Sequence, residues 1–278
     1  MIKILITGGN GNIAKMIKNN LSDYYDITNL SRTELNILDI KAIESYLQNN
    51  NFDILVHTPI NGGRRTKTEN GDVTHFNILM FENMVLFADK FKMIINLDSA
   101  AIYDRNTDIL NRSENDIYTI PHDYYGFSKY VIYKRTLQYD NIYNFRIFNI
   151  FHENEEPDRF IKSCMIANRD NTIVTIHEDK YFDFVYVDDF IKICTYYFDN
   201  CNNKEVLEKT INICYTEKYT LSDIAKLILS NNKDKIEIIK STSKNNYSGK
   251  DDLLHNLNLN LDGLEKSLTK YEKAFISS

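Results

Sequence analysis

The chain has 278 residues, of which 43% are hydrophobic, and a formal net charge of −6. This size and composition allow a full hydrophobic core and exclude a largely disordered chain. The acidic balance excludes a cationic surface for nucleic acid or for a membrane, so we expect a small-molecule partner. A short apolar N-terminal stretch and four cysteines without C-x-x-C spacing predict a cytoplasmic protein with reduced cysteines and no metal site.

Continuous apolar runs alternate with amphipathic stretches along the first half of the chain. This alternation is typical of parallel strands that crossover helices bury on both faces. The sequence therefore predicts an α/β fold with a Rossmann-like, doubly wound parallel sheet. Its strands are expected at residues 2–7, 26–30, 52–58, 92–97 and 142–148.

After residue 151 the apolar runs become shorter and less regular, which predicts a smaller C-terminal α/β lobe. We place a large domain at residues 1–155 and the smaller lobe at residues 156–278, with an approximate boundary and segments that can interleave. The later elements are short strands at 173–177, 210–214 and 236–239 and helices at 188–198, 221–229 and 261–275.

A glycine-rich turn follows the first predicted strand directly, with Gly8, Gly11 and Ala14 in G-x-x-G-x-x-A spacing. Gly8 permits a tight turn, Gly11 lets the backbone approach a pyrophosphate, and the following helix presents free N–H groups. The turn predicts that residues 1–155 bind a dinucleotide and that the smaller lobe binds substrate. The alternative is an ordinary strand-to-helix turn. Expected dinucleotide contacts are Gly8, Gly9, Asn10, Gly11, Asn12 and Ile13.

The end of the second predicted strand bears on the choice of cofactor. An acidic residue there favours NAD, because its carboxylate bonds the ribose 2′-hydroxyl and repels a 2′-phosphate. The segment at residues 26–32 ends instead in Ser31 and Arg32, whose guanidinium can pair with a phosphate. We expect NADP(H), with NAD(H) left open. The alternative for Arg32 is a solvated surface charge.

Tyr125 and Lys129 lie four residues apart on one face of a predicted helix. A neighbouring ammonium lowers the tyrosine pKa from its ordinary value of ~10, which suits proton transfer near neutral pH. Tyr-x-x-x-Lys alone is a weak signal in a chain with 19 tyrosines. Ser99 strengthens it, because this hydroxyl follows a buried strand at its carboxyl end, where α/β sheets bind ligands.

These motifs, in this order, resemble the extended short-chain dehydrogenase/reductase family, of the NAD-dependent epimerase/dehydratase type. The resemblance also includes residues 145–149 and 183–189 and covers nearly the whole chain. It implies that Tyr125 is the acid/base, that Lys129 holds the nicotinamide ribose and lowers the tyrosine pKa, and that Ser99 bonds the substrate oxygen.

The resemblance also implies roles that have structural alternatives. Asp39, followed by Ile40, matches the family position near the adenine, and a helix N-cap is the alternative. For Ser99 the alternative is a cap at the strand end. The family often forms homodimers through helices that correspond here to residues 77–90 and 125–138, where Ile78, Phe81, Val85 and Ile132 form apolar faces that could instead face the sheet.

Extended members mostly act on nucleotide-diphosphate sugars. Dehydratases have an Asp-Glu pair after the hydroxyl residue, whereas this chain has Ala100 and Ala101, which cannot transfer protons. Residues 32–39 and 61–63 resemble 4-keto reductases such as GDP-fucose synthase, but Ala101 replaces its epimerisation cysteine, and residues 159–165 contain no matching histidine. We therefore expect an NADPH-dependent reductase of a nucleotide-linked 4-keto (6-deoxy) sugar that does not epimerise it.

Two other functions stay open: an NAD-dependent nucleotide-sugar 4-epimerase, and a sensor or scaffold that binds dinucleotide without turnover. Phe182 occupies a position where the family often has a nucleotide-binding arginine. The alternative for each basic candidate contact is simple solvent exposure. Candidate substrate contacts are Arg64, Arg65, Ser99, Asn149, Lys162 and Lys250.

Overall fold

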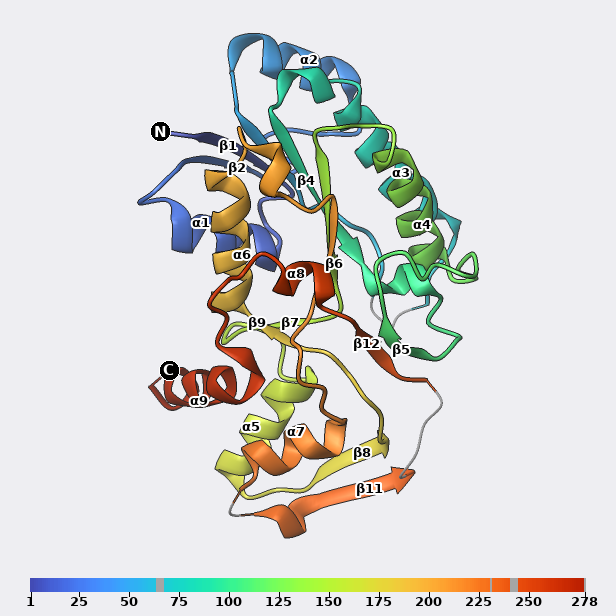
Figure 1. The fold of residues 1–278 in the computed structure, drawn as a ribbon, viewed down its shortest axis with the longest axis vertical. Coiled ribbons are helices and arrows are strands. Elements are labelled where there is room, and N and C mark those ends of the chain that lie inside the picture. The colour runs from blue at the N-terminus through green and yellow to red at the C-terminus, as the bar shows by residue number, and fades with distance from the viewer. Residues whose placement is uncertain (64–67, 231, 241–244, 278) are drawn as a thin grey trace. The chain divides into compact units, whose positions relative to one another are not determined.

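The computed structural model describes residues 1–63, 68–230, 232–240 and 245–277 (Figure 1). Its Cα positions form two compact units, and the chain passes between them repeatedly. Two segments depart from a single boundary near residue 155, because residues 105–116 belong to the second unit and residues 191–211 to the first. Unit 1 comprises residues 1–104, 117–147 and 191–211, and unit 2 comprises residues 105–116, 148–190 and 212–278.

A six-stranded sheet in the order β10-β6-β4-β3-β1-β2 organises unit 1. The pairs β1–β2, β1–β3, β3–β4 and β4–β6 are parallel, which confirms the predicted doubly wound fold. The chain builds outward from β1 in both directions, so the order reverses between β1 and β3 and creates the kind of switch point where such sheets bind ligands. The strands are β1 (Lys3–Thr7), β2 (Asp26–Leu30), β3 (Ile54–His57), β4 (Met93–Ser99), β6 (Ile142–Ile147) and β10 (Thr210–Ile213).

Helices join these strands, and polar side chains cap several of them. Asn70 caps α3 by accepting a hydrogen bond from the Asp72 N–H, and Asp123 caps α4 through the Gly126 N–H. Tyr197 of α6 packs its ring edgewise against Phe145 of β6. The helices are α1 (Asn12–Leu21), α2 (Ile40–Asn49), α3 (Gly71–Val85), α4 (Tyr124–Thr136) and α6 (Val187–Asp199), with 3-10 turns η1 (Ala88–Lys90), η2 (Ala100–Tyr103) and η3 (Lys204–Val206).

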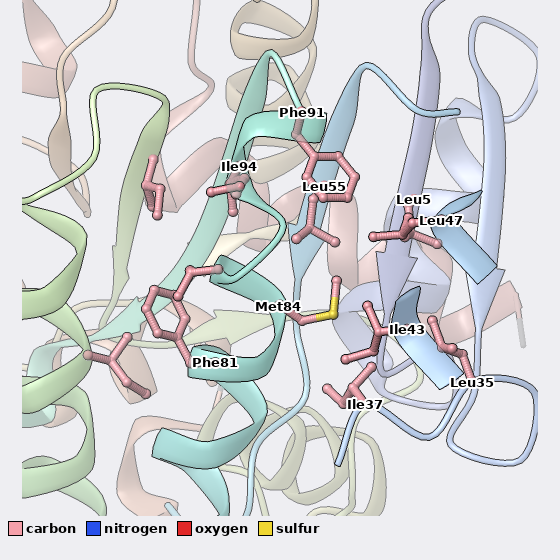
Figure 2. Close-up of a cluster of buried hydrophobic side chains, with 14 residues drawn as sticks. Leu5, Leu35, Ile37, Ile43, Leu47, Leu55, Phe81, Met84, Phe91 and Ile94 are labelled. Atoms are coloured by element: carbon pink, nitrogen blue, oxygen red, sulfur yellow. The ribbon is translucent and has the colours of Figure 1, made fainter. Parts of the chain in front are cut away.

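One face of the sheet is covered by α2, α3 and α4, which bury a continuous apolar cluster (Figure 2). In Figure 2, Met84 of α3 and Ile43 of α2 point toward one another beside Leu55 of β3. Alternate residues of each strand supply this face because strand side chains alternate between the two faces. The cluster contains Leu5, Leu35, Ile37, Ile43, Leu47, Leu55, Phe81, Met84, Val85, Ala88, Phe91, Ile94, Ile132 and Ile142.

The same cluster shows which way the apolar residues of α3 and α4 face. Phe81, Val85 and Ile132 are almost completely buried in it, and Ile78 packs against it. The alternative, that these residues face the sheet, is therefore the one observed. They belong to the core of unit 1 and are not available to a partner.

Unit 2 consists of short elements, and its three strand pairs are parallel. The predicted strand at 210–214 is wrong in its assignment to the smaller lobe, because β10 is hydrogen-bonded to β6 in the central sheet. The strand pairs are β5 (Ile109–Arg112) with β12 (Tyr247–Gly249), β7 (Ile150–Phe151) with β9 (Val185–Tyr186), and β8 (Val174–Glu178) with β11 (Ile236–Lys240). The helices are α5 (Phe160–Asp170), α7 (Leu221–Ile228), α8 (Asp252–His255) and α9 (Gly263–Ser277), with a 3-10 turn η4 (Lys233–Lys235).

We expect Phe81→Ala to lower the free energy of unfolding by about 3–5 kcal/mol, because it leaves a cavity in the cluster of Figure 2. Leu86→Ala, just beyond the same helix, is the control: its side chain is 59% exposed, so the change should stay within about 0.5 kcal/mol. Chemical denaturation of the three proteins measures both values. Equal losses in the two variants would contradict the assignment of Phe81 to the core.

Candidate active site

The glycine turn after β1 has the geometry of a phosphate-binding loop. Gly8 has φ +77°, and a Cβ there would lie 2.8 Å from Thr58 Oγ1 and 2.9 Å from the Pro59 nitrogen. The Gly11 N–H donates to the Gly8 carbonyl (2.9 Å), and Gly11 is the N-cap of α1 with no side chain to occupy the N–H groups of the first turn. N–H groups at a helix start without a side-chain cap are the kind that an anion can satisfy. Six of the predicted dinucleotide contacts, Gly8 to Ile13, lie in this turn or at the start of α1.

An acidic residue that the sequence analysis did not identify, Glu34, lies shortly after the end of β2. The N–H and Oγ of Ser31 donate to the same Glu34 carboxylate oxygen at 2.8 and 2.7 Å. These hydrogen bonds lower the pKa of Glu34 and fix a carboxylate beside Ser31. The signal was present as Ser-x-x-Glu, the spacing of a capping box. Arg32 is exposed, and no hydrogen bond or ion pair to it is found within the described residues.

Asp39 caps α2, accepting hydrogen bonds from the N–H groups of Lys41 (2.9 Å) and Ala42 (3.3 Å). The structural alternative for this residue is therefore realised. Ile40, the first residue of the helix, is 44% exposed. A contact of Asp39 and Ile40 with an adenine stays a prediction.

Three contacts bring α4 to the carboxyl end of β4, around Ser99. Lys129 Nζ donates to the carbonyl of Leu97 at 2.6 Å, two residues before the serine. Tyr125 packs with Ala101, two residues after it. A Cβ on Gly126 would lie only 2.7 Å from the Ala101 carbonyl, so glycine is what permits this approach.

The candidate catalytic side chains are almost buried, with exposed fractions of 8% for Ser99, 8% for Tyr125 and 4% for Lys129. Ser99 Oγ accepts a hydrogen bond from the Ala101 N–H at 3.2 Å, so Ser99 is also the N-cap of the η2 turn. This agrees with the structural alternative for Ser99, a cap at the strand end. Lys129 Nζ lies 5.8 Å from the centroid of the Tyr125 ring. The structure thus brings a phenol and an ammonium to the strand end that carries the hydroxyl.

Burial controls the protonation of Lys129. Removal from water disfavours the ammonium and lowers the pKa of Lys129 to about 8, while the Asp98 carboxylate opposes this shift. His57, at the end of β3, is also buried, and its pKa falls to about 3 because of burial and repulsion from Lys129. At neutral pH the site therefore holds a lysine cation beside a neutral imidazole.

Glu69 connects the loop after β3 to the start of α4, a role that no local sequence pattern signalled. One of its oxygens accepts from the Gly63 N–H (2.6 Å) and the other from the Tyr125 N–H (3.3 Å). Gly63 has φ +88°, and a Cβ there would lie 3.1 Å from Cζ of the Tyr125 ring. Glycine backbone therefore lies against this ring. The predicted substrate contacts Arg64 and Arg65 lie outside the described residues.

The other predicted substrate contacts are in unit 2. Asn149 Oδ1 accepts a hydrogen bond from Arg159 Nη2 at 2.8 Å, and Lys162 Nζ donates to the Glu153 carbonyl. Lys250 is exposed. Their contact with a substrate stays a prediction.

Phe182 fills the position of the family arginine with an aromatic contact. Its ring lies 5.1 Å from those of Phe184 and Tyr247. No helix in the described ranges is long and apolar enough to span a bilayer, and those ranges contain no cluster of three potential metal ligands from His, Cys, Asp or Glu.

A family model described as the NAD dependent epimerase/dehydratase family matches residues 4–214. The chain belongs to this family. The match includes the glycine turn, Ser99, Tyr125 and Lys129, and it confirms the predicted family and the expectation of an NAD(P)-dependent enzyme. No curated protein sequence matches the chain.

Solved structures that share the fold of this epimerase/dehydratase family member include two reductases. It is 15% identical to a GDP-mannoheptose C4 reductase from Campylobacter jejuni with NADP bound (TM-score 0.79, 100% of this chain and 98% of that one). It is 17% identical to a dTDP-4-dehydrorhamnose reductase from Bacillus anthracis in complex with NADP (TM-score 0.81, 100% of both chains). A dTDP-glucose 4,6-dehydratase from the same species in complex with NAD is 12% identical (TM-score 0.78, 100% and 97%).

We expect Gly11→Ala to weaken NADPH binding at least about tenfold, or about 1.4 kcal/mol, without unfolding the protein. An added Cβ at Gly11 meets only the Gly8 carbonyl, at 3.2 Å, but it occupies the space that a pyrophosphate needs. Gly71→Ala is the matched control, since a Cβ there meets nothing within 4 Å. Calorimetric titration with NADPH measures the effect, and unchanged affinity in Gly11→Ala would contradict the phosphate-loop assignment.

His57 predicts a loss of stability in acid. Its pKa in the folded chain is about 3, against about 6.5 when unfolded, so between these values only the unfolded state takes up a proton there. The contribution of His57 to the free energy of unfolding is therefore fully present above about pH 6.5 and decreases as the pH falls toward 3. Between about pH 7 and 4.5 it should contribute a decrease of about 2–3 kcal/mol.

His57→Asn should remove this component, so its free energy of unfolding should fall less between about pH 7 and 4.5 than that of the wild type. Denaturant titrations at the two pH values measure the difference. The exposed His75, changed to Asn, is the control and should behave as wild type. An equally steep decrease in His57→Asn would show that its imidazole is not held neutral.

Proposed function

We propose that this chain is an NADPH-dependent reductase of a nucleotide-diphosphate-linked 4-keto (6-deoxy) sugar. The observation that carries the proposal is the convergence at the end of β4, where the contacts of Lys129 with Leu97 and of Tyr125 with Ala101 bracket Ser99. An acid, a cation and a hydroxyl in an almost dry site are the groups that carbonyl reduction requires. A protein that only bound a dinucleotide would need none of them.

Tyr125, Ser99 and Lys129 have separate roles in the proposed reduction. The glycine turn would hold the pyrophosphate of NADPH, and the reduced cofactor would supply the hydride for C4 of the sugar. As the carbonyl electrons move to the oxygen, the Tyr125 phenol gives that oxygen its proton, and the ketone becomes a secondary alcohol. Ser99 Oγ donates a hydrogen bond to the same oxygen. The Lys129 cation stabilises the phenolate that remains and holds the nicotinamide ribose.

Arg32 supports NADP(H) over NAD(H). Its exposed guanidinium lies just beyond β2, where the adenosine ribose of a dinucleotide lies in this kind of fold, and it can pair with a 2′-phosphate. The NADP in the two related reductases agrees with this choice. We also assign Asp39 and Ile40 to the adenine end of the cofactor.

Reduction is favoured over dehydration by the residues next to Ser99. Ala100 and Ala101 are completely or almost completely buried and have no group that could carry a proton to or from the sugar. Two solved structures with this fold are named as sugar reductases, which also supports reduction. Substrate contacts are proposed for Arg64, Arg65, Asn149, Lys162 and Lys250, the basic residues serving the diphosphate.

The proposed setting is cytoplasmic, which agrees with four cysteines that are buried and free of disulfides. We propose a homodimer that pairs through the exposed sides of α3 and α4. Tyr124 and Phe127, at the start of α4, are 48% and 38% exposed and provide apolar surface there.

One observation favours a second function, an NAD-dependent nucleotide-sugar 4-epimerase. The Glu34 carboxylate bonded to Ser31 places a negative charge near the end of β2, and a carboxylate there suits the ribose 2′-hydroxyl of NAD. An epimerase would keep its cofactor oxidised between turnovers, and it would therefore show no net consumption of NADPH.

We expect the wild type to consume NADPH with one or more GDP- or dTDP-linked 4-keto sugars, measured as loss of reduced-nicotinamide absorbance. Tyr125→Phe should lower kcat about 100- to 10,000-fold because it removes the proton donor. Its affinity for NADPH should stay close to that of the wild type.

Tyr130→Phe, the same substitution five residues further along α4, is the matched control and should keep wild-type turnover. Sugar interconversion without NADPH loss would support the epimerase instead. Full turnover in Tyr125→Phe would show that this residue is not the acid.

A further inference from the structure

Two side chains of opposite charge are buried next to the candidate active site, and one of them belongs to the residue before Ser99. Asp98 of β4 and Arg146 of β6 are register partners on adjacent parallel strands, and Arg146 Nε donates to Asp98 Oδ2 at 2.8 Å. Both side chains are completely buried. Such a pair is costly to desolvate, and a hydrophobic pair could often replace it without loss of stability. Its presence therefore calls for a purpose beyond packing.

Arg146 is held on several sides. Its Nη1 donates to Tyr103 Oη at 2.7 Å, and its guanidinium lies 4.9 and 4.8 Å from the ring centroids of Tyr103 and Tyr133. Tyr103 belongs to η2, the turn that follows Ser99, and Tyr133 belongs to α4, the helix that carries Lys129. The guanidinium consequently fixes the position of the Asp98 carboxylate relative to both.

Asp98 stands between two residues of the site. Leu97 accepts the hydrogen bond from Lys129, and Ser99 is the candidate hydroxyl. Only Oδ2 of the Asp98 carboxylate is bonded to Arg146, and Oδ1 is buried without a hydrogen bond in the described part of the chain. The carboxylate, paired with Arg146 through Oδ2, thus belongs to the residue directly after the carbonyl that Lys129 binds.

We propose that Asp98, clamped by Arg146, is a positioning residue that keeps Lys129 charged and docked on the Leu97 carbonyl. This assignment deepens the proposed function and rests on it for its catalytic meaning. The carboxylate touches neither substrate nor cofactor in this role. It acts through the lysine, which in turn acts on Tyr125.

The electrostatic balance around Lys129 gives the sign of the effect. The described charged or titratable groups around its ammonium are Asp98 from β4 with its partner Arg146 from β6, His57 from β3 and Tyr125 on α4 itself. His57 is neutral at working pH because its pKa falls to about 3. Burial lowers the pKa of Lys129 to about 8 even with Asp98 present, so loss of that anion should bring it to neutral pH or below.

The direct test measures the protonation of Lys129 without substrate or cofactor. Full-length protein with isotope-labelled lysine ε-carbons is titrated by NMR, and the Lys129 resonance is assigned by its absence in Lys129→Met. In Asp98→Asn the titration midpoint of Lys129 should move down by about one pH unit or more. An unchanged midpoint in folded Asp98→Asn would overturn the proposal.

Asp98→Asn leaves Arg146 buried without its counter-charge, so a double variant guards against failure to fold. Asp98→Asn combined with Arg146→Met removes both charges together, and it should lower the Lys129 midpoint as well. Asp53→Asn is the matched control, because Asp53 pairs with Lys92 at 2.9 Å at the opposite end of the sheet strands. Its Lys129 midpoint should equal that of the wild type.

Turnover separates this proposal from the proposed function. With NADPH and a 4-keto sugar, the alkaline limit of kcat should move to lower pH in Asp98→Asn by the same amount as the Lys129 midpoint, and kcat should recover as the pH is lowered. A merely structural role would lower kcat at every pH and overturn the proposal. A shifted midpoint in a protein that turns over no such sugar would support the Asp98 assignment while refuting the reductase function.

Discussion

The site depends on one buried interaction, the hydrogen bond from the Lys129 ammonium to the Leu97 carbonyl. A lysine with 4% exposure has lost nearly all of its hydration, and only protein groups can replace it. The bond fixes α4 on the end of β4, and the helix then brings Tyr125 to the same place through its i, i+4 spacing. If the lysine left this position, only the contacts of Tyr125 and Gly126 with Ala101 would still hold the start of α4 beside Ser99.

Parallel strands explain why residues far apart in the sequence meet at one edge of unit 1. The glycine turn follows β1, Ser31 follows β2, His57 ends β3 and Ser99 ends β4, and every one of these is a carboxyl end. In a parallel sheet these ends lie on the same side, so a dinucleotide held at β1 and a substrate oxygen at β4 can reach one another. The proposed chemistry is thus a consequence of the strand order.

The buried polar groups between β4 and β6 show how such a site is supported. Asn96 donates to Asn144 at 2.9 Å two register positions away from Asp98 and Arg146, and the apolar pair Leu97 and Phe145 lies between these two polar pairs. Polar pairs specify one register and one strand partner more strictly than aliphatic contacts do. The register matters here because Ser99, the residue after Asp98, must lie at a fixed distance from the substrate oxygen that it is proposed to bind.

The sequence by itself determined the fold class and the central strands, and it predicted the phosphate turn and the set of Ser99, Tyr125 and Lys129, because apolar periodicity, glycine spacing and an i, i+4 pair are local signals. Only the tertiary structure decided what depends on contacts between distant segments. It joined Glu69 to Tyr125, paired Asp98 with Arg146, placed β10 in the central sheet and buried the apolar faces of α3 and α4. These partners lie up to tens of residues apart, and no local pattern specifies which distant side chain will meet them.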